Sequence, residues 1–182
     1  MSQTLIVAKF GGTSVADFEA MNRSADVVLQ DASTRLVVLS ASAGITNLLV
    51  SLAEGQPAAQ RAVLLDDIRR IQYAIVDRLQ RPDVIRDEID RMIDNISMLS
   101  EAASLATSSA LTDELVSHGE LMSSLLFVEI LRERQVNAEW FDVRRVLRTD
   151  DRFGRAVPDV DVLATQATEQ LQPRIAQALV VT

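Results

Sequence analysis

Two short apolar segments near the start of the chain constrain its fold more than any other feature. Residues 4–8 and 36–39 are unbroken runs rich in Leu, Ile and Val, without the polar alternation of a strand that has one face in water. They predict parallel strands buried on both faces. Between them, apolar residues recur at helical spacing over 15–29, with Ser14 as the expected N-cap and Asp17 three residues later. The segment therefore predicts a strand–helix–strand unit.

The rest of the chain continues this alternation around a long helical middle. The spacing predicts helices nearly throughout residues 46–134, a third strand over 138–143, a last helix over 159–177 and a fourth strand at 179–182. This pattern favours an α/β fold, with a layered, mostly parallel sheet, helices on both faces and a helix-rich middle. The 182 residues are enough for one domain.

Composition excludes several classes of function. The 18 basic and 26 acidic residues give a net charge of −8, which disfavours nucleic acids and anionic membranes as partners. The lack of cysteine and the single histidine exclude disulfides, thiolate catalysis and histidine-cluster metal sites. The start of the chain has no signal-peptide pattern, and no apolar run is long enough to cross a bilayer. We therefore expect a cytoplasmic protein without a resident metal.

The single lysine of the chain, Lys9, stands at the end of the first predicted strand, directly before Phe10, Gly11 and Gly12. In parallel α/β sheets, ligands bind beyond the carboxyl ends of the strands, where helix N-termini offer free N–H groups to anions. An ammonium group beside glycine N–H groups is suited to a phosphate. The other interpretation is a tight turn with a solvated lysine, because in the Walker A loop the lysine follows the glycines.

Two further segments carry candidate ligand groups. The second predicted strand ends in a small, hydroxyl-rich loop, residues 40–47, which either binds a polar ligand or forms a turn with Thr46 as the next N-cap. Gly119 lies inside a predicted helix, where glycine costs about 1 kcal/mol relative to alanine, so we expect a close approach there. Glu120 either binds a cationic group such as an amine or is a surface carboxylate. His118 is more typical of a packing residue than of a catalyst.

Three motifs together resemble the aspartate kinases. They are KFGGTSV at residues 9–15, VVLSAS at 37–42 and SHGE at 117–120, and the resemblance extends over the whole chain. It implies an amino-acid-kinase fold and transfer of the γ-phosphoryl group of ATP, with Mg²⁺, to the side-chain carboxylate of L-aspartate. The product would be 4-phospho-L-aspartate, on the route to lysine, threonine and methionine.

The resemblance also implies roles for individual residues. The family lysine stabilises charge on the transferred phosphoryl group, its glycines and a serine approach the phosphates, and a threonine and a glutamate bind aspartate, the glutamate through the α-amino group. The matching positions are Lys9, Gly11, Gly12 and Ser40 on the phosphate side, and Thr46 and Glu120 on the aspartate side.

Family kinase domains continue beyond the strand that matches residues 180–182. We therefore expect residues 1–182 to be the N-terminal, aspartate-side portion of such a domain, without the nucleotide-binding half or the ACT domains that bind feedback lysine. We expect this portion to be inactive alone and the protein to form a homodimer. The alternative is a non-catalytic dimerisation or ligand-binding module with the same fold.

Overall fold

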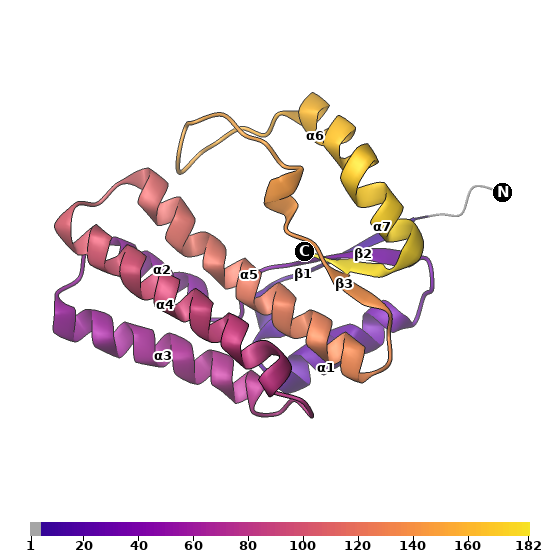
Figure 1. The fold of residues 1–182 in the computed structure, drawn as a ribbon, viewed down its shortest axis with the longest axis horizontal. Helices are drawn as coiled ribbons and strands as arrows, with labels where there is room; N and C mark the ends of the chain where they lie inside the picture. The colour runs from indigo at the N-terminus through magenta and orange to yellow at the C-terminus, as the bar shows by residue number, and fades with distance from the viewer. Residues whose placement is uncertain (1–4) are drawn as a thin grey trace.

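The computed structural model describes residues 5–182 and contains a four-stranded sheet (Figure 1). All neighbouring strands are parallel, and the strand order is β1-β2-β4-β3. The strands are β1 (Ile6–Phe10), β2 (Thr34–Leu39), β3 (Ala138–Trp140) and β4 (Leu179–Val181). The parallel sheet is confirmed, and the first strand lies two residues later than predicted. Thr4, where the predicted strand starts, lies outside the described residues.

Seven α-helices connect and cover the described strands. They are α1 (Phe18–Leu29), α2 (Ile45–Ala53), α3 (Ala58–Val76), α4 (Asp83–Leu105), α5 (Ser109–Glu133), α6 (Val160–Gln166) and α7 (Gln172–Gln177). Short 3₁₀ turns occupy Gly12–Val15 and Val143–Arg145, and a π-helical turn spans Ala167–Leu171. No helix within residues 5–182 is long and apolar enough to cross a membrane.

The ends of three helices and strands differ from the prediction. Helix α1 is capped by Asp17, whose carboxylate accepts from the backbone N–H of Ala20 at 2.7 Å, because residues 12–15 form a 3₁₀ turn first. Helix α2 begins after Gly44 at φ +88° rather than at a Thr46 cap. The third strand stops at Trp140 and a 3₁₀ turn follows.

The last predicted helix is interrupted. The interruption is a π turn that precedes α7, and α7 carries a proline in its first turn. Proline has no N–H group with which to continue the regular hydrogen-bond ladder, so the helix changes its winding before it.

Helices cover both faces of the sheet, as predicted. Alternate residues of a strand point to opposite faces, and the core divides accordingly: Leu179 and Val181 of β4 join the large cluster under α1 and α5, whereas Val180 joins a small cluster under α6 and α7. Figure 1 shows α6 and α7, in yellow, on the side of the sheet opposite α1. The two clusters bury β4 on both faces. The prediction of burial on both faces was wrong for β1, because this strand lies at the edge of the sheet and one of its faces is exposed, with Val7 53% exposed.

Helix α5 is the centre of the helical layer. It packs on α1, α2 and α4 as well as on three strands of the sheet, and its buried residues lie on more than one side of the helix. A helix with apolar residues around most of its circumference is typical of a core position. Its N-terminal half, which carries Gly119 and Glu120, is thereby held beside the loop that follows β2.

Candidate functional site

The loops after β1 and β2 meet at the carboxyl edge of the sheet. The backbone N–H of Ser40 donates to the carbonyl of Phe10 at 3.1 Å, so the segment around Gly11 and the loop after β2 lie side by side. Lys9 pairs with Val38 across the two strands. Because Ala8 and Phe10 pack on the large cluster, the side chain of Lys9 points to the opposite face, where it is exposed.

Gly11 and Gly12, which follow β1, differ in the space that surrounds them. A Cβ added to Gly12 would lie 2.8 Å from the carbonyl oxygen of Ala41, so this position allows the loop after β2 to approach closely. A Cβ at Gly11 would meet nothing within 4 Å, and its backbone is in the ordinary extended region at φ −82°. Gly12 therefore serves packing between the loops, and Gly11 leaves open space at the edge.

The close approach expected at Gly119 is confirmed. A Cβ on this residue would lie 2.6 Å from the Cβ of Ala41 and 3.3 Å from Ile45 of α2. The glycine lets α5 contact the loop after β2 and the first turn of α2 directly. This contact brings Glu120 to the same edge as Ser40.

Glu120 lies on α5 with its carboxylate turned to that loop. Its Oε1 accepts from the backbone N–H of Ala41 at 3.3 Å, and the side chain is half-buried. One carboxylate oxygen is thus occupied by the protein and the other has no protein donor within residues 5–182. The carboxylate is held in place and keeps capacity for a cationic group.

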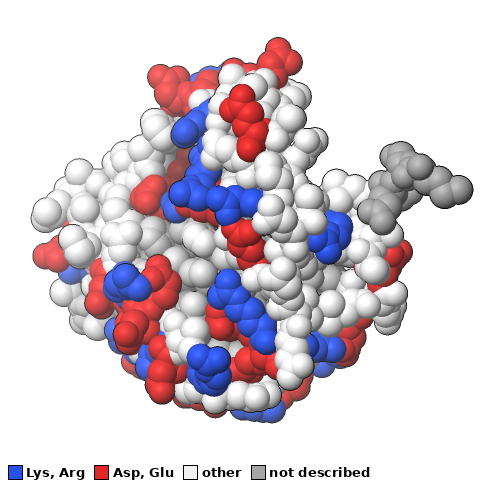
Figure 2. Space-filling view, turned by 45° about the vertical axis from the view of Figure 1, so that its right-hand side comes forward, with Lys and Arg blue, Asp and Glu red and all other residues white. Residues whose placement is uncertain are grey.

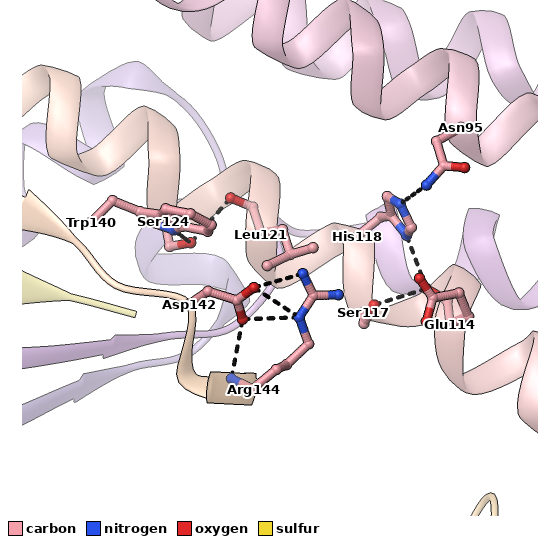
Figure 3. A network of polar contacts seen from close by, with 9 residues as sticks. All are labelled: Asn95, Glu114, Ser117, His118, Leu121, Ser124, Trp140, Asp142 and Arg144. Atoms are coloured by element: carbon pink, nitrogen blue, oxygen red, sulfur yellow. Dashed lines mark hydrogen bonds and ion pairs between the residues drawn. The ribbon is translucent and has the colours of Figure 1, made fainter. Parts of the chain in front are cut away.

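A cavity of about 490 Å³ adjoins Glu120. Its wall is mainly apolar and includes Leu36 and Val38 of β2 together with Trp140, the single tryptophan of the chain. The indole Nε1–H of Trp140 donates to the Ser124 hydroxyl of α5 at 2.9 Å (Figure 3). The volume is in the range of small-molecule sites.

Arg144 and Asp142 form an ion pair on the same wall. The guanidinium group donates from Nε and Nη2 to the two carboxylate oxygens at 2.9 and 2.8 Å (Figure 3). Hydrogen bonding to Arg144 holds the pKa of Asp142 below its usual value, and the same bond raises the pKa of Arg144. The positive charge of Arg144 is therefore already matched by a carboxylate within the chain.

His118 is a satisfied packing residue, as expected. It is 3% exposed, and its Nδ1 donates to the carbonyl of Glu114 at 2.9 Å, since a carbonyl oxygen only accepts. Its Nε2 pairs with the side-chain amide of Asn95 at 3.0 Å (Figure 3). The Nε2 contact joins α5 to α4, whereas the Nδ1 bond stays within α5.

The structure brings some of the predicted site residues together and leaves others apart. Gly12, Ser40 and Glu120 meet around Ala41, whereas the side chains of Lys9 and Thr46 are exposed and form no hydrogen bond or ion pair with any described residue. Within residues 5–182, no group of three or more His, Asp or Glu side chains is arranged to hold a metal ion. Figure 2 shows acidic and basic side chains interspersed over the visible face.

Sequence reasoning did not single out two residues of the site. Ser123 is on α5, fully buried against the loop after β2. The sequence could have indicated it only through its spacing, because it follows Glu120 by three residues and so lies on the same side of the helix. Gly44 has the positive φ that starts α2. A glycine directly before an apolar helical run is the only sequence signal for it.

The parallel sheet, with Gly12, Ser40 and Glu120 at the carboxyl edge where α/β domains bind ligands, defines an α/β domain with a candidate ligand site. Comparison with known proteins narrows this class. A model of the amino acid kinase family matches residues 4–182. Lysine-sensitive aspartokinase 3 of Escherichia coli is 68% identical over 178 residues, which are 98% of this chain and 40% of the relative. The chain therefore belongs to the amino acid kinase family, among the aspartokinases.

Solved structures agree with this assignment. The crystal structure of E. coli aspartokinase III in complex with aspartate and ADP superposes with a TM-score of 0.97, at 68% identity, over 98% of this chain and 40% of that one. The aspartate kinase of Clostridium acetobutylicum, 19% identical, has a TM-score of 0.72 over 98% of this chain and 38% of its own, and shows the fold alone. The chain spans about 40% of the length of the E. coli relative.

Proposed function

We propose that this chain is the N-terminal, aspartate-side portion of an aspartate kinase, which transfers the γ-phosphoryl group of ATP to the side-chain carboxylate of L-aspartate. The observation that carries the proposal is the meeting of Gly12, Ser40 and Glu120 around Ala41 at the carboxyl edge of a parallel sheet. The similarity to an aspartokinase whose structure contains aspartate and ADP supports the substrate pair.

The chemistry asks little of the protein beyond positioning and charge. The attacking group is the carboxylate of aspartate, which is ionised at neutral pH, so no general base is needed. Lys9 stabilises negative charge on the transferred group, and the N–H groups of Gly11 and Gly12 and the side chain of Ser40 face the phosphates. Mg²⁺ enters with ATP as part of the substrate.

Glu120 and Thr46 serve the aspartate side in this proposal. The Glu120 carboxylate, fixed by the N–H of Ala41, pairs with the α-ammonium group of the substrate. Thr46 offers a hydroxyl from the first turn of α2, at the positive end of the helix dipole. The cavity of about 490 Å³ beside Glu120 has ample room for an amino acid.

The test is to trap the acyl phosphate as a hydroxamate with hydroxylamine. The complete polypeptide encoded by the reading frame that contains these residues is supplied with MgATP and L-aspartate, and hydroxamate is expected. Glu120→Gln should lose most of this signal at low aspartate. Glu101→Gln, which changes an exposed carboxylate on α4, should retain it. No hydroxamate from the folded polypeptide would overturn the proposal.

The second part of the proposal is that residues 1–182 alone do not turn over and that the protein forms a homodimer. The isolated chain is expected to give no hydroxamate in the same assay, and robust turnover would contradict this. A folded full-length polypeptide without affinity for aspartate or nucleotide would favour a non-catalytic dimerisation or binding module instead. Sedimentation of the full-length polypeptide tests the dimer.

A further inference from the structure

A buried seam joins helix α5 to the loop after β2. The hydroxyl of Ser123, which has no exposed surface, donates to the carbonyl of Ser40 at 2.8 Å and lies 3.2 Å from the carbonyl of Glu120. The N–H of Ala41 donates to the Glu120 carboxylate at 3.3 Å. Gly119 has no side chain, and a Cβ at this position would push the loop and the helix apart. Loop and helix are thus connected by two hydrogen bonds and a direct backbone approach.

Ser123 differs from four other serines of α4 and α5 in where its proton goes, and like Ser24 of α1, whose hydroxyl donates to the carbonyl of Ser14, it bonds outside its own helix. A hydroxyl in a helix ordinarily donates to the carbonyl three or four residues earlier. That local bond is the single hydrogen bond donated by the side chains of Ser100, Ser104, Ser117 and Ser124. Ser123 has one proton and its shorter contact is to Ser40, 83 positions away. Its donor therefore holds two distant segments together.

The position of Glu120 depends on this seam. Ser40 and Ala41 are consecutive, so the bond from Ser123 to the Ser40 carbonyl also sets where the Ala41 N–H meets Glu120. Without it, the loop keeps a single 3.3 Å bond to α5. The carboxylate then loses part of its orientation relative to the loop that faces the phosphates.

We propose that Ser123 is a positioning residue, which orients Glu120 toward the ammonium group of the substrate by fixing the loop after β2 on α5. This inference rests on the proposed function, because the orientation matters only if Glu120 binds the substrate. Ser123 is buried and acts through Glu120 without touching the ligand.

The experiment is a double-mutant cycle on aspartate binding. The dissociation constant of L-aspartate is measured by calorimetry on the complete polypeptide, with Ser123→Ala, Glu120→Gln and the double variant. Ser123→Ala is expected to weaken binding about 5- to 10-fold, the effect of one net hydrogen bond. In the Glu120→Gln background the same change is expected to weaken it less than about twofold, since the two residues act as a unit.

Ser100→Ala is the matched control. Ser100 is equally buried in α4, and its hydroxyl donates only to the carbonyl of Ser97 at 2.7 Å. This variant loses a buried serine hydroxyl without losing the seam, so aspartate affinity should stay unchanged in both backgrounds. If Ser123→Ala does not fold, Ser123→Cys, which keeps the shape and weakens the donor, is taken through the same cycle.

The outcomes separate the two proposals. Unchanged affinity in Glu120→Gln would overturn the proposed role of Glu120 in aspartate binding, whatever Ser123 does. Weakened affinity in Glu120→Gln together with normal affinity in Ser123→Ala would overturn the positioning role alone. A Ser123→Ala effect that is equally large in both backgrounds would also overturn it, since the serine would then act independently of Glu120.

Discussion

The face of the sheet under α1 and α5 and the face under α6 and α7 bury very different amounts of side chain. The first carries almost the whole core, including Met21, Ile45 and Phe127, each without exposed surface. The second has three buried hydrophobic residues, one of which is Phe141. The large cavity adjoins this thinly packed face, and Lys9 extends on the same side. We therefore expect the side chains under α1 and α5 to stabilise the fold more than those of the second face, where the cavity and Lys9 lie.

The largest expected effect tests this expectation directly. Phe127→Ala should cost about 4 kcal/mol of unfolding free energy, because a fully buried phenylalanine leaves a cavity in close packing. Phe141→Ala should cost about 2 kcal/mol, because its ring borders a cavity and packs in a small cluster. Urea unfolding of the 182-residue chain measures both. Equal costs would mean that the second face stabilises the fold as much as the first.

Lys9 tests whether a residue on the second face contributes to activity and not to stability. In the complete polypeptide, Lys9→Ala is expected to lower kcat about 10²- to 10³-fold, the loss found when one preorganised transition-state donor is removed. Because the side chain is exposed, the unfolding free energy should change by less than about 0.5 kcal/mol. Steady-state kinetics and urea unfolding of the same variant check the two statements.

Arg70→Ala is the control for Lys9. It removes a cation that is exposed on α3 and paired with Asp67, and it should leave kcat unchanged. Near-normal turnover in Lys9→Ala would take the lysine out of the proposed mechanism, and a large loss of stability would contradict the separation of the two faces.

Alanine substitutions at two glycines compare a tightly packed position, Gly119, with an open one, Gly11. Gly119→Ala puts a Cβ 2.6 Å from that of Ala41, so overpacking of about 1 to 3 kcal/mol should exceed the gain of about 1 kcal/mol in helix propensity. Gly11→Ala meets nothing within 4 Å and should change stability by less than about 0.5 kcal/mol. Thermal unfolding of both variants measures the difference, and a neutral Gly119→Ala would show that α2 and α5 separate easily.

The strands, the helical middle and the cover on both faces were predictable because hydrophobic periodicity reports burial directly. The residues at which α1 and α2 begin could not be predicted in the same way. Asp17 and Ser14 are both good caps by residue type, and the choice depends on a 3₁₀ turn that no periodicity reveals. The close approach at Gly119, by contrast, was predictable, because a glycine in the middle of a helix is costly unless another segment needs the space.

The sequence did not say what approaches Gly119, because Ala41 is 78 positions away from it and meets it only through the fold. The role of Ser123 is hidden for the same reason. Its hydrogen-bond partner Ser40 lies on another segment of the chain.

The smallest effect concerns the ion pair of Asp142 and Arg144, on the ligand side of the sheet. Arg144 holds the pKa of Asp142 below its usual value of 3.8. A depressed folded-state pKa stabilises the fold above the unfolded value, and the contribution disappears as the pH falls through the folded value. Asp142→Asn should therefore cost less than about 1 kcal/mol at neutral pH.

The pH profile identifies this contribution. The difference between the parent chain and Asp142→Asn should be constant from about pH 7 to 5 and should shrink as the pH falls below 3.8, where the unfolded carboxyl also takes up its proton. Asp67→Asn, in an exposed pair on α3, provides the comparison, with a cost of at most about 0.5 kcal/mol. A difference that persists unchanged in acid would mean that Asp142 stabilises the turn after β3 through hydrogen bonds that asparagine does not replace, rather than through its charge.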